Sequence, residues 1–282
     1  MNKKRIIPET TEEKMKLIAP LRPIDDIFFE VLATDKLVCQ EIIRTILQDD
    51  KIIVEEVIVQ DSLKNIYGRS VRLDALCILG NGTRCNVEVQ RSDNNNHLKR
   101  ARFNASSITV KDSVVGEKFE GIKDVIIIYI SQFDFLGKGL CTYHIDKIIR
   151  ETSDVVDDGL SEIFVNTAID DKSDIAELMK CFLQQKVNNP KFPELSRKTE
   201  EIKETGRGAD TMCDFMDKYI KESRAEGIAE GKAEGITEGK IKATIKTAKE
   251  FGATDDAIIK SLVKNCNLSE AEAREELQNY SE

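Results

Sequence analysis

Residues 71–90 read Val-Arg-Leu-Asp-Ala-Leu-Cys-Ile-Leu-Gly-Asn-Gly-Thr-Arg-Cys-Asn-Val-Glu-Val-Gln. Two alternating segments flank the Gly-Asn-Gly at 80–82, and this composition is typical of a β-hairpin loop because its residues accept positive φ. In the register that a three-residue loop sets, Asp74 lies opposite Glu88, with their Cβ atoms about 5 Å apart. Gln90 is two residues from Glu88, so both side chains point to one face. The sequence therefore predicts two carboxylates brought together across a hairpin.

Directly opposed carboxylates repel each other and destabilise a sheet. A divalent cation between them turns this repulsion into attraction, and hard oxygen ligands suit Mg²⁺. Such an ion can polarise a phosphoryl oxygen and lower the pKa of a bound water molecule. The alternative from the residues alone is a pair of solvent-exposed acids, one of them paired with Arg72 or Arg91.

Further strand and helix patterns extend from this hairpin in both directions. Strands are expected at 51–60, at 125–131, where the pattern is typical of a fully buried strand, and as edge strands at 139–145 and 162–167. Helical spacing covers 24–47, with a break near 33–35, and a helix is expected within 94–113. The order predicts an α/β fold in which helices flank a mixed sheet.

The C-terminal part reads as helical. A helix is expected from Ser173 to Val187, and helical patterning resumes near Glu194. The four-residue repeat at 224–239 places four glycines on one drifting stripe, each costing about 1 kcal/mol relative to alanine. The segment is either a flexible tether or a helix that packs on a partner. We favour the helix, which makes a homo-oligomer the expected assembly.

Four parts of the chain are predicted from these patterns. They are a weakly ordered N-terminal arm at 1–20, an α/β domain at 21–190, a helical segment with the repeat at 191–240, and a small helical bundle at 241–282. In the bundle, Ser269 and Glu272 have the spacing of a capping box.

Composition narrows the functional classes. The 282 residues are 40% hydrophobic and 33% charged, which is typical of a soluble globular protein without a membrane segment. Seven cysteines without a CxxC pair indicate free thiols and a cytoplasmic protein. The net charge is −9, yet residues 64–123 carry eleven Lys and Arg against six Asp and Glu. This excess fits either a phosphate-binding face or a solvated surface. No nucleotide-binding glycine loop is present, so no nucleotide cofactor is expected.

The segment Val71-Arg72-Leu73-Asp74, the hairpin and Glu88-Val89-Gln90 resemble the D…ExQ form of the PD-(D/E)XK nuclease signature. More specifically, the chain resembles the recombination-promoting nuclease (Rpn) group, the PD-(D/E)XK nuclease family transposases. Other matching features are Pro23-x-x-Asp26-x-x-Phe29, Arg100, Gly116-Glu-Lys-Phe119 and the EG-repeat tail at 226–239.

This resemblance implies a restriction-endonuclease-like core and a metal-dependent DNA endonuclease, linked to recombination or mobile elements. Mg²⁺ is the implied ion, with Mn²⁺ as a substitute. By position, Asp74 and Glu88 would be the metal ligands and, with Gln90, the catalytic residues. Gln90 stands where many relatives have Lys, and an amide can orient a group only by hydrogen bonding. Asp26 is a further candidate ligand, and Glu30 lies four residues on along the same helix face.

Basic side chains follow the ExQ strand and are candidates for binding DNA phosphates. They are Arg91, Lys99, Arg100, Arg102 and Lys111. Their alternative is a solvated helix face. His97 is expected to be exposed in a polar loop, and His144 to lie on an edge strand. A second hypothesis of another class is a catalytically weak DNA-binding or assembly protein, which uses the same basic face and self-associates through the glycine-striped helix.

Overall fold

The computed structural model describes residues 10–63, 71–114, 116, 118–266 and 268–280. Contacts divide the chain into two compact units, Met1–Met216 and Asp217–Glu282, which are considered separately. The domain boundaries expected from the sequence stay predictions beside this division. In the described residues, no helix is both long and apolar enough to cross a bilayer.

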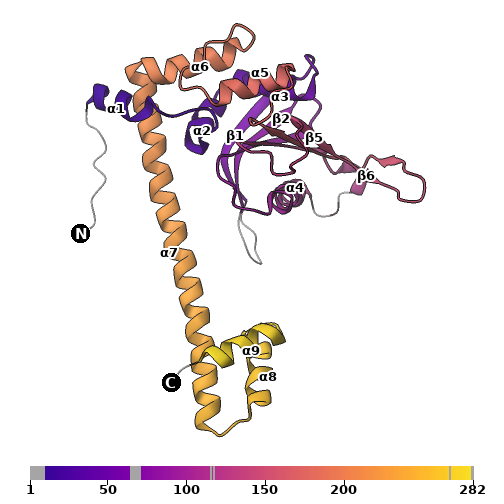
Figure 1. Ribbon diagram of the computed structural model, residues 1–282, viewed down its shortest axis with the longest axis vertical. Coiled ribbons are helices and arrows are strands. Elements are labelled where there is room, and N and C mark those ends of the chain that lie inside the picture. Colours follow the sequence, from indigo (N-terminus) through magenta and orange to yellow (C-terminus); the bar gives the residue numbers. More distant parts are fainter. Residues whose placement is uncertain (1–9, 64–70, 115, 117, 267, 281–282) are drawn as a thin grey trace. The chain divides into compact units, whose positions relative to one another are not determined.

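The first unit combines helices with a large sheet (Figure 1). Its helices are α1 (Thr11–Ile18), α2 (Asp26–Ala33), α3 (Lys36–Leu47), α4 (His97–Asp112), η1 (Phe119–Gly121), α5 (Asp174–Phe182) and α6 (Pro193–Glu204). Its strands are β1 (Val54–Leu63), β2 (Val71–Leu79), β3 (Arg84–Gln90), β4 (Val125–Ser131), β5 (Thr142–Ile145), β6 (Lys147–Ile148), β7 (Val155–Val156) and β8 (Leu160–Asn166).

The sheet is mixed, as the sequence predicted. Among the described residues, six strands run in the order β1-β2-β3-β4-β8-β5, and β6 and β7 form a separate pair. Strands β1, β2 and β3 are antiparallel neighbours, β3, β4 and β8 are parallel, and β5 is antiparallel to β8. The expectation that 162–167 is an edge strand is wrong. β8 lies inside the sheet, and its end from Ile163 to Asn166 is buried between β4 and β5.

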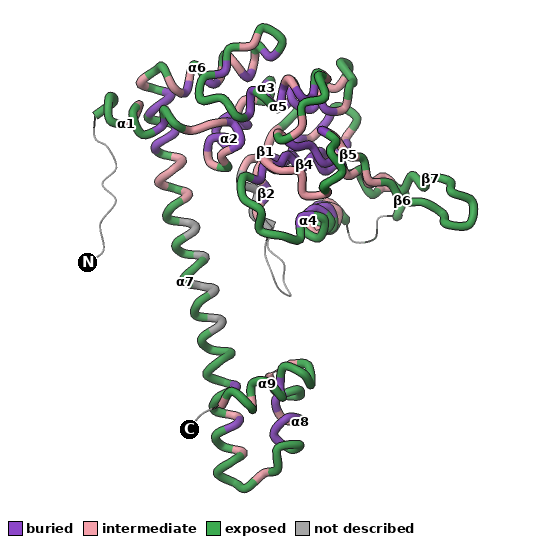
Figure 2. Tube along the Cα trace, viewed as in Figure 1, coloured by how far each residue is buried: buried purple, intermediate pink, exposed green. Residues whose placement is uncertain are grey.

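Helices cover both faces of this sheet (Figures 1 and 2). One core joins Phe28 of α2 and Ile42 of α3 to inward-facing strand residues such as Val87, together with residues of α5 and α6. The other core lies under α4, where Ala105 and neighbouring apolar residues pack with Tyr129 of β4. The hairpin β2–β3 therefore runs through the middle of the unit, with one face turned towards α4.

Several helix ends follow from local hydrogen bonds. The predicted break near residues 33–35 is confirmed, because Asp35 is the N-cap of α3 and accepts from Leu37 N at 3.1 Å. Ser173 caps α5 as predicted, but the helix ends at Phe182 rather than at Val187. Just after this end, the amide groups of residues 183 and 184 donate to the carbonyl groups three residues before them, in the 3₁₀ pattern that terminates the helix.

The N-terminal segment differs from the predicted weakly ordered arm. Residues 1–9 lie outside the described residues, but Thr11–Ile18 form α1. Ile18 is fully buried, and Lys14 forms an ion pair with Asp210 at 2.6 Å. This part of the expected arm is therefore packed within the first unit.

The second unit is helical, as expected. Helix α7 (Gly206–Glu250) begins in the first unit, and α8 (Asp255–Cys266) and α9 (Glu270–Asn279) follow it. A small core gathers residues of all three helices around Leu262. The capping box of Ser269 and Glu272 is present at the start of α9.

Candidate active site

The predicted hairpin register is confirmed. Ala75 pairs with Val87 and Cys77 with Cys85, while Leu79 N donates to Thr83 O at 3.0 Å across the loop. The loop closes tightly because Gly82 adopts a φ of 87°, a conformation that glycine accepts at little cost. The two strands are thereby fixed in the register that sets Asp74 against Glu88.

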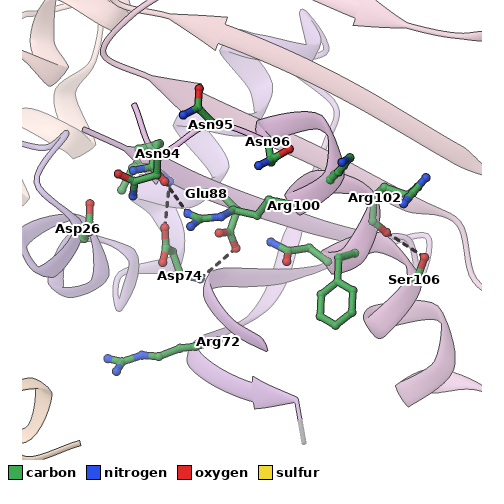
Figure 3. A pocket seen from close by; sticks show the side chains of 15 residues that line it. Asp26, Arg72, Asp74, Glu88, Asn94, Asn95, Asn96, Arg100, Arg102 and Ser106 are labelled. Atoms are coloured by element: carbon green, nitrogen blue, oxygen red, sulfur yellow. Dashed lines mark hydrogen bonds between the residues drawn. The ribbon is translucent and has the colours of Figure 1, made fainter. Parts of the chain in front are cut away.

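The backbone pairing of the two strands ends at Ala75 and Val87. Beyond this pair, each carboxylate accepts a hydrogen bond from a backbone amide of the opposite strand. Asp74 N donates to Glu88 Oε1 at 3.3 Å, and Val89 N donates to Asp74 Oδ2 at 3.0 Å. Asn86 Nδ2 also donates to Glu88 Oε1, at 2.8 Å. Asp74 and Glu88 therefore converge on one side of the sheet (Figure 3).

Burial makes this acid pair electrostatically unfavourable. Glu88 is only 5% exposed, and burial raises its pKa to about 7 against the opposing hydrogen bonds from Asn86 and from Asp74 N. The pKa of Asp74 is raised well above its usual value, first by burial and then by the charge of Glu88. Burial also raises the pKa of Asp26 on α2. These acids are not the solvent-exposed pair of the alternative interpretation, and their surroundings favour a nearby cation.

The acids lie at an open cleft of about 1050 Å³ (Figure 3). Asp26 of α2 stands on one side, and the hairpin supplies Asp74, Glu88 and Gln90. The remaining wall comes from the 94–96 loop and from α4. This cleft brings together the acidic candidates of the sequence with part of the basic set.

Arg100 brings a positive charge to the acid pair from α4. Its Nη1 donates to Gln90 Oε1, and the charge of its guanidinium group partly opposes the rise that burial causes in the pKa values of Glu88 and Asp26. Gln90 is 6% exposed, and its Nε2 donates to Ser92 O at 2.7 Å. The Gln90 amide is thus engaged in holding an arginine.

The five basic candidates separate into two groups. Lys99, Arg100 and Arg102 line the cleft, whereas Arg91 and Lys111 are not among the described residues that line it. Arg91 is 60% exposed and pairs with Asp25 at 3.1 Å. Lys111 is in the last turn of α4, about 18 Å along the helix axis from Lys99 at 1.5 Å per residue.

Glu30 and Arg72 form an ion pair at the side of the site. Glu30 is buried on α2, and Arg72 Nη2 lies 3.4 Å from Glu30 Oε1. Arg72 also lines the cleft. The helix face shared by Asp26 and Glu30 therefore meets both the cleft and a partly buried cation.

The expectation that His97 is solvent-exposed is wrong. The side chain is buried at the first position of α4, where Nδ1 lies 2.9 Å from Tyr129 Oη. The preceding Asn95 and Asn96 both have φ near +60°, and this left-handed turn directs the histidine into the core. His144 lies on the edge strand β5, as predicted, and its side chain is exposed.

A comparison with protein families shows the family of the chain. Residues 26–180, more than half of the chain, match the family described as PD-(D/E)XK nuclease family transposase. The chain belongs to this family. The match begins at Asp26 and includes the hairpin, the sheet and α4. Comparisons with curated proteins and with solved structures give no match.

Membership in the PD-(D/E)XK nuclease family transposases agrees with the mixed sheet flanked by helices, which is the restriction-endonuclease-like fold that the resemblance implied. It also supports a nuclease or transposase-like role. PD-(D/E)XK nucleases generally use divalent metals. The fold and the broad functional class expected from the sequence are therefore confirmed.

The donors at the cleft fit a hard divalent cation. Among the described side chains, no group of three or more His, Cys, Asp or Glu forms a ready-made metal cluster. Mg²⁺ is usually held by one or two carboxylates, with water and substrate phosphates completing its shell. Asp74 and Glu88 provide such a pair, and burial raises the pKa of each carboxyl group.

Other cleft residues had no sequence signal of their own. Asn94, Phe103, Asn104 and Ser106 line the cleft but belong to no recognised motif. Helical spacing from Arg100 gives Asn104 one turn later, which is the one pattern that could have placed it. The asparagine run suggested a loop, but its position beside the acids depends on the packing of α4.

Proposed function

We propose that this protein is a metal-dependent DNA endonuclease that hydrolyses phosphodiester bonds, with Mg²⁺ as its ion and Mn²⁺ as a substitute. The convergence of Asp74 and Glu88 in a cleft with Arg100 beside them carries this proposal. Family membership supports the DNA substrate and a link to recombination or mobile elements. All seven cysteines are free thiols, which supports work in the reducing cytoplasm.

Each cleft residue has a distinct proposed role. Asp74 and Glu88 would hold the ion, with Asp26 as a third acidic neighbour. When bound, the ion supplies Lewis acidity towards a phosphoryl oxygen and lowers the pKa of water. Arg100 would stabilise the negative charge that develops on the phosphate, and Gln90 would hold the guanidinium group in place.

The other basic side chains would bind and position the DNA backbone. Lys99 and Arg102 line the cleft and would contact the phosphates nearest to the acids. Arg91 and Lys111 lie outside the cleft lining and would contact phosphates further along the DNA. Phosphate contacts of this kind position the backbone and carry no sequence information directly.

Nicking of supercoiled plasmid DNA tests the proposed activity. The purified protein is expected to produce open circles in Mg²⁺ or Mn²⁺, to stop in EDTA, and to resume when Mg²⁺ is added in excess. Salt-dependent DNA binding without nicking in either metal would contradict the nuclease proposal. That outcome would favour a catalytically weak DNA-binding or assembly protein.

Self-association through the glycine stripe of α7 is a further part of the proposal. A Cβ atom added at Gly227, Gly231, Gly235 or Gly239 would meet nothing within 4 Å. Alanine at two of these positions should therefore stabilise an isolated helix by about 1 kcal/mol each. In an oligomer packed through the stripe, the added methyl groups would separate the two backbones.

The double change Gly231→Ala and Gly235→Ala separates these cases. We expect the oligomer seen by light scattering to weaken, while Lys232→Ala, on the same helix between the two glycines, leaves it unchanged. Wild-type protein that is monomeric at all concentrations would contradict self-association. An unchanged oligomer with a higher unfolding temperature would contradict packing through the stripe.

A further inference from the structure

A line of hydrogen-bonded side chains leads from the cleft to the surface. Arg100 donates to Gln90 Oε1, and Tyr129 Oη lies 3.3 Å from the same oxygen. His97 Nδ1 is 2.9 Å from Tyr129 Oη, and His97 Nε2 is 2.9 Å from Asp93 Oδ1. Asp93 is 57% exposed, so the line ends at a solvent-exposed side chain.

Tyr129 Oη donates its single hydroxyl proton to Gln90 Oε1, and the same oxygen is hydrogen-bonded to His97 Nδ1. His97 Nε2 then donates to the Asp93 carboxylate, and this hydrogen bond lowers the pKa of Asp93.

Aromatic rings surround the middle of the line. The His97 ring lies 4.9 Å from Phe135 and 5.2 Å from Phe133, measured between centroids. Tyr129 is fully buried and packs on Phe164 at 5.7 Å. Water cannot easily replace a lost partner among these rings, so each polar group depends on its neighbour in the line.

We propose that Tyr129 and His97 are positioning residues that hold the Gln90 amide with its Oε1 towards Arg100, and so hold the guanidinium group beside Glu88. Both amide ends of Gln90 are engaged, because Nε2 donates to Ser92 O at 2.7 Å. The tyrosine hydroxyl adds a second donor to Oε1 and opposes rotation of the amide. This inference rests on the proposed nuclease function.

Tyr129→Phe tests this role by removing one oxygen from the line. We expect kcat for nicking to fall about tenfold, as when an outer hydrogen-bond partner of a catalytic group is lost, while KM for DNA stays within twofold. Asp93→Asn, at the exposed end, should act in the same direction by a smaller factor. Single-turnover reactions with excess enzyme keep slow variants measurable.

Tyr143→Phe is the matched control. Tyr143 Oη accepts from the amides of residues 138 and 140 at 3.2 and 3.1 Å and donates to Asp134 at 2.7 Å, on the edge strand β5. The same substitution there removes more hydrogen bonds, without any to Gln90. It should lower the unfolding temperature and leave kcat unchanged.

A double-mutant cycle distinguishes positioning from a general loss of structure. In an Arg100→Ala background, Tyr129→Phe should have no further effect on kcat, because the group it positions is gone. A wild-type kcat in Tyr129→Phe, or an equal loss with and without Arg100, would overturn the inference. An inactive wild-type protein would instead overturn the nuclease proposal, so the two failures are distinguishable.

Discussion

Asp74→Asn and Glu88→Gln are each expected to abolish plasmid nicking and to stabilise the metal-free protein. Activity should fall by at least about 10³-fold, because a metal ion contributes several kcal/mol of charge stabilisation and each 1.4 kcal/mol is a factor of ten. The amides keep the size of the acids but bind a hard cation far more weakly. Nicking at the wild-type rate by either purified variant would remove the assignment of both residues.

The two variants are expected to gain stability although they lose activity, because each removes a buried negative charge. The pKa of Glu88 is raised from 4.5 to about 7, so the folded protein disfavours the carboxylate form. Above about pH 7 this penalty is present in full, and it disappears as the pH falls below 4.5. Glu88→Gln removes up to about 3 kcal/mol of it at pH 8, at 1.36 kcal/mol per pKa unit. Its unfolding temperature in EDTA should exceed that of the wild type most at pH 8.

Metal binding gives a measurement that does not depend on cleavage. Mg²⁺ or Mn²⁺ should raise the unfolding temperature of the wild type, because an ion that binds only the folded state stabilises it. Neither amide variant should respond in this way. Asp146→Asn, at an exposed acid outside the cleft lining, is the matched control and should retain both nicking and the metal response.

The acid pair was predictable because its geometry is local. A Gly-Asn-Gly loop sets the register of two adjacent strands, and this register alone places Asp74 against Glu88. The break at Asp35 and the cap at Ser173 were predictable for the same reason, since each depends on hydrogen bonds within a few residues. The roles of these acids as metal ligands stay predictions.

Features that depend on packing between distant segments were missed or only partly seen. His97 was predicted to lie exposed in a loop. Its burial depends on the left-handed turn before it and on aromatic residues of 129–135, which are distant in the sequence. The contact of Arg100 with Gln90 needs α4 to lie over the hairpin. The position of β8 inside the sheet depends on parallel pairing with β4, which no short-range pattern specifies.

Arg100→Ala is expected to lower kcat about 10²-fold with little change in KM. The guanidinium group lies close enough for its charge to oppose the rise that burial causes in the pKa of Glu88, so it acts where negative charge develops. Arg102→Ala, two residues away on the same helix and also in the cleft, is the matched control. It should raise KM, leave kcat nearly unchanged, and reduce the salt dependence of DNA binding by about one phosphate contact. Equal effects of the two changes would show that Arg100 is an ordinary phosphate contact.

Gln90→Lys tests whether the positive charge at the site must come from a lysine at position 90 or is already supplied by Arg100. If a lysine at this position were needed, the change would raise activity. In the structure, the Gln90 oxygen accepts from both Arg100 and Tyr129, and an ammonium group can accept from neither. It would also set a second cation against the guanidinium group. We therefore expect Gln90→Lys to lower kcat, and to lower it less once Arg100→Ala has removed the competing charge.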